Sequence, residues 1–162
     1  MGKHDHPADH NDYDHYRNQA ATPRRGLVVV ASTRAAQGVY EDESGKTLAT
    51  WLTSRGFDTP EPVIVADADI PNHFAQLFGD IASLPQVVLT TGGTGLSDDD
   101  ITVDELAKYL TKQLPGIAMQ FWQTGLRATS LAVCSRAIAG TVEHTFVMAA
   151  PKIGRASCRE RV

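Results

Sequence analysis

Short apolar runs, separated by polar stretches, recur along the middle of the chain. The first, Gly26–Ser32, is an unbroken run rich in valine, and such runs are typical of strands buried on both faces of a parallel sheet. Three further apolar runs follow at Pro62–Ala66, Gln86–Thr90 and Thr145–Ala149. The pattern therefore predicts four strands.

Between these runs, apolar residues recur at helical spacing. The segment Lys46–Arg55 has one apolar face, and Gly56 after it is a natural C-terminal stop. A second helix is expected to begin after Asp69, whose side chain would cap it, with Pro71 tolerated in the first turn.

Two more helices are expected after the third strand. Thr102 with Glu105 three residues later matches a capping box, which favours a helix start. Pro115 ends that helix and begins another, which runs to about Leu126. This alternation of strands and helices predicts an α/β fold with a doubly wound, mostly parallel sheet and helices on both faces.

The third predicted strand leads directly into a glycine-rich loop, TTGGTG at residues 90–95. Ligands of doubly wound folds bind beyond the carboxyl ends of the strands, and backbone amides ahead of a helix can hold a phosphate. The loop matches neither the Walker pattern nor the dinucleotide fingerprint. Two interpretations stay open: the glycines serve an anion site, or they only give the turn its backbone geometry.

Three carboxylates, Asp98, Asp99 and Asp100, follow the glycines. They would repel a phosphate unless a cation lay between, and Mg²⁺ binds one or two carboxylates together with phosphate oxygens. The alternative is that Asp98 and Asp99 are simply solvated, while Asp100 lies near the positive end of the next helix. Asp67 and Asp69 follow the second predicted strand and are expected on the same rim of the sheet.

Composition narrows the classes of function. The 162 residues are 42% hydrophobic, which suits one domain with a core. The formal net charge is −4, and because the first 25 residues are neutral overall and residues 152–162 carry +3, residues 26–151 carry −7. An acidic domain is a poor partner for nucleic acid. No apolar run is long enough for a membrane span or a signal peptide, so a cytoplasmic protein is expected.

The two ends differ from the middle. Residues 1–25 are rich in His and Asp and are expected to form a disordered tail. Residues 152–162 (KIGRASCRERV) resemble the translation of a common sequencing-adapter oligonucleotide. They are therefore expected to be non-native, leaving a C-terminally truncated domain at residues 26–151, and an ordinary basic tail is the alternative. Cys134 is then the domain's single cysteine and is expected to be a small core residue.

Four blocks along this frame resemble the MoaB/Mog family of molybdopterin-binding proteins. The blocks are Ser32–Gly45, Thr90–Thr102, Leu114–Gln120 and Ser135–Gly140. The resemblance implies a molybdopterin-binding domain, usually trimeric, whose catalytic members use Mg²⁺ and ATP to adenylylate the terminal phosphate of molybdopterin.

The resemblance also implies roles for individual residues. Asp69 and Asp100 match catalytic aspartates that would manage Mg²⁺, and Asp67 is a weaker candidate for the role given to Asp69. The residues that match substrate-binding positions are Thr91, Gly92, Gly93, Thr94, Gly95, Ser135 and Arg136. Arg136 is either a contact to the substrate anion or a buried structural ion partner.

Three positions depart from the family pattern. Asp99 stands where arginine is usual, Met119 where glutamate is usual, and Trp122 where arginine is frequent. These departures motivate one alternative, a non-catalytic molybdopterin carrier. A more distant alternative is an interaction scaffold, in which a trimer presents its surface to another enzyme of the molybdenum-insertion pathway. The resemblance also implies a closing helix after the last strand. This chain is expected to lack that helix, so an exposed apolar patch is expected where it would pack.

Overall fold

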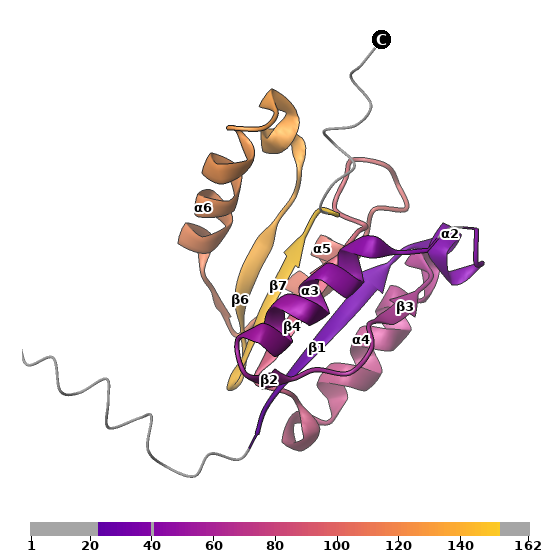
Figure 1. Ribbon diagram of the computed structural model, residues 1–162, viewed down its shortest axis with the longest axis vertical. Coiled ribbons are helices and arrows are strands. Elements are labelled where there is room, and N and C mark those ends of the chain that lie inside the picture. The colour runs from indigo at the N-terminus through magenta and orange to yellow at the C-terminus, as the bar shows by residue number, and fades with distance from the viewer. Residues whose placement is uncertain (1–22, 40, 153–162) are drawn as a thin grey trace, which may run out of the picture.

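The computed structural model describes residues 23–39 and 41–152 (Figure 1). The strands are β1 (Arg24–Ala31), β2 (Phe57–Asp58), β3 (Val63–Val65), β4 (Val87–Thr91), β5 (Lys112–Gln113), β6 (Ile138–Val142) and β7 (Thr145–Ala150). The helices are α2 (Thr33–Ala36), α3 (Glu43–Ser54), α4 (Ile70–Gly79), α5 (Thr102–Ala107) and α6 (Pro115–Gly125), with the 3-10 turns η1 (Asp67–Asp69), η2 (Ile81–Ser83) and η3 (Ser130–Cys134). Within the described ranges, no helix combines the length and the apolar character needed to cross a membrane.

The strands form one mixed sheet in the order β2-β1-β4-β7-β6-β5, and β3 pairs with the end of β1. The strands β1, β2, β3, β4 and β7 run parallel, whereas β6 is antiparallel to both of its neighbours. The four strands expected from the apolar runs are β1, β3, β4 and β7. The prediction of a doubly wound, mostly parallel α/β fold is confirmed.

Alternate side chains of the central strands supply two cores. Val29 and Val88 join Phe74 of α4 in the larger cluster, which α5 also covers. Val28 points to the opposite face and packs with Leu52 of α3. Helices therefore cover both faces of the sheet, and in Figure 1 α3 lies in front of it and α5 behind.

The chain changes direction across the sheet between β1 and β4. From β1, α3 leads to β3 on one side of β1, and α4 then leads back to β4 on its other side. Ligands of doubly wound folds bind outside the carboxyl ends of the strands at such a crossover point. Here that point lies between the segments that follow Ala31 and Thr91.

The start of the domain differs from the sequence prediction. Arg24 and Arg25, which were expected in the N-terminal tail, form the start of β1 and pair with Phe57 and Asp58. The guanidinium of Arg25 donates to the carbonyls of Ser83 and Leu84, both at 2.9 Å. Residues 1–22 of the expected tail and residues 153–162 of the adapter-like segment lie outside the described residues, whereas Lys152, the first residue of that segment, is described.

Two predicted helix caps are wrong. Asp69 does precede α4, but its side chain makes no capping hydrogen bond. No side chain caps α5 either, because the helix begins at Thr102 itself. Thr102 is fully buried and its amide donates to the carbonyl of Gly93 at 3.0 Å. A tertiary contact thus replaces the local cap.

The prediction that Cys134 is a core residue is also wrong. Cys134 is exposed at the end of η3, and Leu131 and Val133 of the same turn are more than half exposed. β6 follows this turn and forms a hairpin with β7, through a turn in which Glu143 has φ of 50°. The apolar residues Leu131 and Val133 beside Cys134 therefore lie at the surface.

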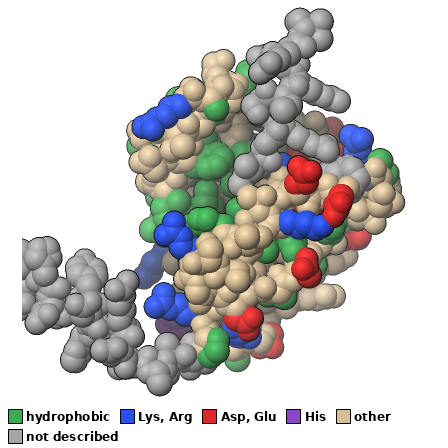
Figure 2. Space-filling view, in the orientation of Figure 1, with side chains coloured by type: hydrophobic (Ala, Val, Ile, Leu, Met, Phe, Trp, Pro, Cys, Tyr) green, Lys and Arg blue, Asp and Glu red, His purple; other side chains and the backbone are tan. Residues whose placement is uncertain are grey.

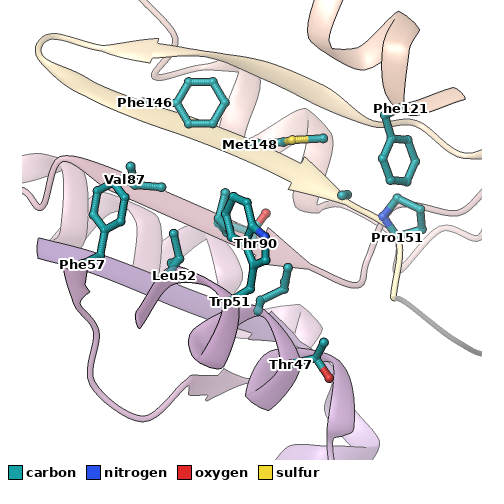
Figure 3. A pocket seen from close by; sticks show the side chains of 13 residues that line it. Thr47, Trp51, Leu52, Phe57, Val87, Thr90, Phe121, Phe146, Met148 and Pro151 are labelled. Carbon is teal, nitrogen blue, oxygen red and sulfur yellow. The ribbon is translucent and has the colours of Figure 1, made fainter. Parts of the chain in front are cut away.

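An apolar groove runs along the face of the sheet between α3 and α6, and Figure 2 shows hydrophobic side chains gathered in this hollow. Its volume is about 560 Å³. Side chains from α3, β4, β7 and α6 point into it (Figure 3), among them Trp51, Phe121, Phe146 and Met148. The described residues thus form an open apolar groove, and its relation to the expected closing helix stays a prediction.

Candidate functional site

The ends of four parallel strands are joined in pairs at the crossover point. After β1, the amide of Ser32 donates to the carbonyl of Val65 at 2.8 Å. After β4, the amide of Gly92 donates to the carbonyl of Ala150 at the end of β7, at 3.3 Å. The glycine loop therefore leaves the sheet from a fixed position, and in Figure 1 it lies at the same end of the sheet as α2.

Two glycines of the loop have backbone conformations that other residues rarely adopt. Gly92 has φ of 93° and Gly93 has φ of 59°. A Cβ on Gly92 would overlap the carbonyl oxygen of Ala31, and one on Gly93 would overlap Oγ1 of Thr102. The turn geometry alone therefore requires these glycines.

The hydrogen bonds of the loop are divided unequally between carbonyls and amides. The carbonyls of Gly93, Thr94 and Gly95 accept from Thr102, from the Arg136 amide and from the Arg136 side chain. Within the described part of the chain, no acceptor is recorded for the amides of Gly93, Thr94, Gly95 and Leu96. These four amides are therefore available to donate hydrogen bonds to a ligand.

Buried hydroxyl groups surround the loop. Oγ1 of Thr91, Oγ1 of Thr102 and Oγ of Ser135 are buried, and none has a hydrogen-bond partner among the described residues. Buried polar groups of this kind are uncommon in folded proteins and are explained by function or by ordered water. The structure thus brings the predicted residues Thr91 and Ser135 to the loop and adds Thr102.

Arg136 reaches the loop from the segment between η3 and β6. Its Nε donates to the carbonyl of Gly95 at 2.8 Å, and NH2 donates to the carbonyl of Asp100. NH1 donates to both carboxylate oxygens of Asp104, at 3.0 and 2.7 Å. Of the two interpretations left open by the sequence, these contacts favour the structural ion partner.

The three carboxylates after the loop have different surroundings. Asp98 and Asp99 are exposed, whereas Asp100 is half-buried and its Oδ2 accepts from the amide of Ser97 at 3.1 Å. A shallow cavity of about 250 Å³ is lined by Asp98 and Asp100, together with Asp104 and Arg136. Asp100 is therefore the carboxylate of this turn that is held in place.

The two earlier carboxylates also differ. Oδ2 of Asp67 accepts from the amide and the hydroxyl of Thr33, both at 2.8 Å, which joins the end of β3 to the segment after β1. Asp69 is exposed at the start of α4. The structure thus holds Asp67 at the crossover point and leaves Asp69 on the surface.

Asp42 is a residue of the site that the sequence analysis missed. It is 5% exposed, caps α3 by accepting from the amide of Gly45 at 2.6 Å, and lies 3.6 Å from Nζ of Lys152. The side chain of Lys152 lies over Gly92. The signal was present, since Asp is a favoured cap residue directly before a helix.

Comparison with known proteins bears on what this arrangement does. The family model "Probable molybdopterin binding domain" matches residues 27–156. The chain belongs to this family. Molybdopterin adenylyltransferase from Escherichia coli is 33% identical over 135 residues, which covers 80% of this chain and 67% of that protein. Molybdenum cofactor biosynthesis protein B from Bacillus subtilis is 29% identical over 140 residues, which covers 85% and 81% of the two chains.

The fold of this molybdopterin-binding domain matches solved structures as well. The Mog protein from Mycobacterium ulcerans, described as a molybdopterin biosynthesis protein, superposes with a TM-score of 0.73 at 33% identity, covering 84% of this chain and 88% of that one. The resemblance to the MoaB/Mog family is therefore confirmed.

Few side chains near the crossover point of the domain could bind Mg²⁺. In the described ranges, no three His, Cys, Asp or Glu side chains gather as a metal cluster. The strands before Asp67 and Asp100 flank β1, so these carboxylates start from strand ends about 10 Å apart. Mg²⁺ commonly binds one or two carboxylates, phosphates and water. The described residues therefore offer Mg²⁺ one or two carboxylates and no complete set of protein ligands.

Two departures from the family pattern have contrasting surroundings in the domain. Trp122 donates from Nε1 to the carbonyl of Ser135 at 3.0 Å, which ties α6 to the segment that carries Arg136. Met119 is 55% exposed on the same helix. Trp122 thus supports the site, whereas Met119 leaves an apolar side chain on the surface.

Proposed function

We propose that this protein, within molybdenum cofactor biosynthesis, transfers the adenylyl group of ATP to the terminal phosphate of molybdopterin. The carrying observation is the row of free amides at Gly93–Leu96, with their neighbouring carbonyls fixed, at the crossover point of the sheet. A phosphate would accept hydrogen bonds from these amides. The adenylyltransferase relative supports the choice of reaction.

The proposed step displaces pyrophosphate from ATP. An oxygen of the pterin's terminal phosphate attacks the α-phosphorus of ATP, a new P–O bond forms, and the bond to the β-phosphate breaks. The loop amides and the hydroxyls of Thr91, Thr102 and Ser135 would orient the phosphates. Mg²⁺, when bound, would neutralise charge on the phosphates, and Asp100 is the carboxylate best placed to hold it.

The second carboxylate of this proposal is chosen between Asp69 and Asp67. The family resemblance favours Asp69, whereas the hydrogen bonds to Thr33 favour Asp67. We assign the role to Asp67 because it is held at the end of β3, beside β1. The exposed side chain of Asp69 has no such support.

The experiment incubates the protein with molybdopterin, ATP and Mg²⁺ and measures adenylylated pterin and released pyrophosphate. We expect Asp100→Asn to lower kcat about 100-fold, since it removes the carboxylate that would hold Mg²⁺ beside the reacting phosphates. Asp98→Asn makes the same change on an exposed neighbour and should stay within about twofold. Asp67→Asn should lower kcat more than Asp69→Asn, and the reverse order would return the role to Asp69.

The alternative is a molybdopterin carrier without catalysis. The observation that favours it is Asp99, an exposed negative charge beside the anion loop. A carrier would bind the pterin in calorimetry but show no Mg²⁺-dependent binding of ATP. Pterin binding without adenylylated product would exclude the enzyme and leave the carrier.

Assembly and location belong to the same proposal. The resemblance implies a homotrimer, and the exposed apolar residues Met119, Leu131 and Val133 on α6 and η3 offer a contact surface. Sedimentation over a range of concentrations should give three times the chain mass of 17.5 kDa. A contact with a molybdenum-insertion enzyme and a cytoplasmic location stay predictions.

A further inference from the structure

We propose that Arg136 is a positioning residue: it fixes the glycine loop, the acidic turn and α5 in one arrangement and does not itself contact the substrate. What the loop binds rests on the proposed function, but the positioning role does not. The inference comes from the way in which all three guanidinium nitrogens of Arg136 are engaged within the protein.

The acceptors of Arg136 lie on three separate segments. The carbonyl of Gly95 belongs to the glycine loop, the carbonyl of Asp100 to the acidic turn, and the carboxylate of Asp104 to α5. The backbone amide of Arg136 adds a bond to the carbonyl of Thr94 at 3.0 Å. A planar guanidinium is suited to such divergent contacts because its donors are fixed relative to one another.

This arrangement does not favour the role of a substrate contact. An incoming phosphate could take a guanidinium nitrogen only by displacing one of these acceptors, and the adjacent Asp104 carboxylate already balances the positive charge. The free donors of the site are instead the loop amides, which point away from the bonds that Arg136 makes to the loop carbonyls.

The hydrogen bonds of Arg136 to the two carbonyls hold the loop more strongly than its ion pair with Asp104 does. Asp104 is 59% exposed, and exposed ion pairs contribute little. The contacts to Gly95 and Asp100 are partly buried, and hydrogen bonds from a charged donor are strong. Removing the Asp104 charge should therefore change the loop much less than removing the guanidinium.

A loop of this composition needs an external tether. Gly92, Gly93 and Gly95 carry no side chains, so the loop has more backbone freedom to lose than others when it is ordered. Donors that are already in place bind an anion without that loss. Arg136, which lies outside the loop, restricts the loop's backbone through its hydrogen bonds.

The experiment measures amide hydrogen exchange in the protein without any ligand. The reporting amides are those of Asp100, Ile101 and Thr102, which donate to Ser97, Asp99 and Gly93. We expect Arg136→Ala to accelerate their exchange at least tenfold, while amides of β1 and β4 keep their rates. Arg127→Ala, an exposed arginine beyond α6, and Asp104→Asn should leave the loop within about twofold.

A second measurement links the tether to anion binding. Calorimetry with inorganic pyrophosphate should show at least fivefold weaker binding in Arg136→Ala and nearly normal binding in Asp104→Asn. Arg136→Lys keeps the charge but cannot reach all three acceptors, so it should accelerate exchange at least threefold. This variant decides the question if Arg136→Ala does not fold.

The outcomes separate the alternatives. Unchanged exchange in the loop overturns the proposal, and weaker pyrophosphate binding with unchanged exchange would make Arg136 a direct anion contact. Faster exchange throughout the sheet would also overturn it, because the role would then be general stability. If the wild-type protein binds no pyrophosphate, the proposed function fails, yet the exchange data still decide the role of Arg136.

Discussion

Individual residues of the site were predictable where their chemistry is local. The sequence predicts that the loop TTGGTG follows the carboxyl end of a strand, and the structure places Gly92–Gly95 after β4, at the crossover point. Two acceptors of Arg136, the backbone carbonyls of Gly95 and Asp100, were not predictable, because they lie 41 and 36 residues away in the sequence. A carbonyl is present at every position, so it leaves no signature in the sequence.

Gly93 gives a direct test of this geometry. Gly93→Ala places a Cβ against Thr102 at φ of 59°, so we expect the free energy of unfolding in urea to fall by about 3 kcal/mol. Gly79→Ala is the matched control, since a Cβ there meets no atom within 4 Å, and it should change stability by less than about 1 kcal/mol. Equal effects of the two changes would contradict the tight packing of the loop on α5.

At the scale of elements, the periodic segments were predicted well and the short ones were not. The long helices α3, α4 and α6 lie close to their expected positions. β6 was missed because Ile138–Val142 contains Gly140, which weakens a strand pattern. Only glycine fits there, since a Cβ would overlap the carbonyl of Lys112 in β5. The need for that glycine comes from a neighbouring strand and not from the local pattern.

The helix α4 contains a group whose protonation opposes folding. Burial lowers the pKa of His73 from its ordinary 6.5, and its buried Nε2 has no partner among the described residues. As the pH falls below 6.5, the unfolded chain takes up a proton that the folded chain does not, so stability falls; above 6.5 this effect vanishes.

The substitution His73→Gln should therefore make the free energy of unfolding depend less on pH between pH 6.5 and the lower pKa that His73 has in the folded state. Urea unfolding at several pH values measures this slope. His144→Gln, in the exposed turn between β6 and β7, is the control and should keep the wild-type slope. A His73→Gln curve parallel to the wild type would show that burial of this imidazole does not oppose its protonation.

At the scale of the whole molecule, the apolar runs were enough to predict a parallel sheet but not its order. β4 and β7 are neighbours although almost the whole second half of the domain lies between them. Strand order depends on which edges pair, and hydrophobic runs such as 87–91 and 145–150 do not encode a partner.

The apolar groove between α3 and α6 should bind an apolar dye. We expect anilinonaphthalene sulfonate to fluoresce with the wild-type protein, and Trp51→Glu to reduce the signal at least about twofold, because Trp51 lines the groove and is 49% exposed. Ile81→Glu, a change at a similarly exposed residue in η2, should keep the signal. Loss of fluorescence in both variants, or in neither, would mean that the dye binds elsewhere.

The central place of β7 also has a consequence for synthesis on the ribosome. β7 is the last of the described strands in the sequence, yet it fills the gap between β4 and β6. Until residue 150 has left the exit tunnel, the nascent chain carries an open edge on β4, and such edges invite pairing with other chains. The glycine loop also remains incomplete during this time, because Arg136, which holds it, emerges about forty residues after the glycines. A nascent chain of this protein should therefore depend on chaperones until its last strands are translated.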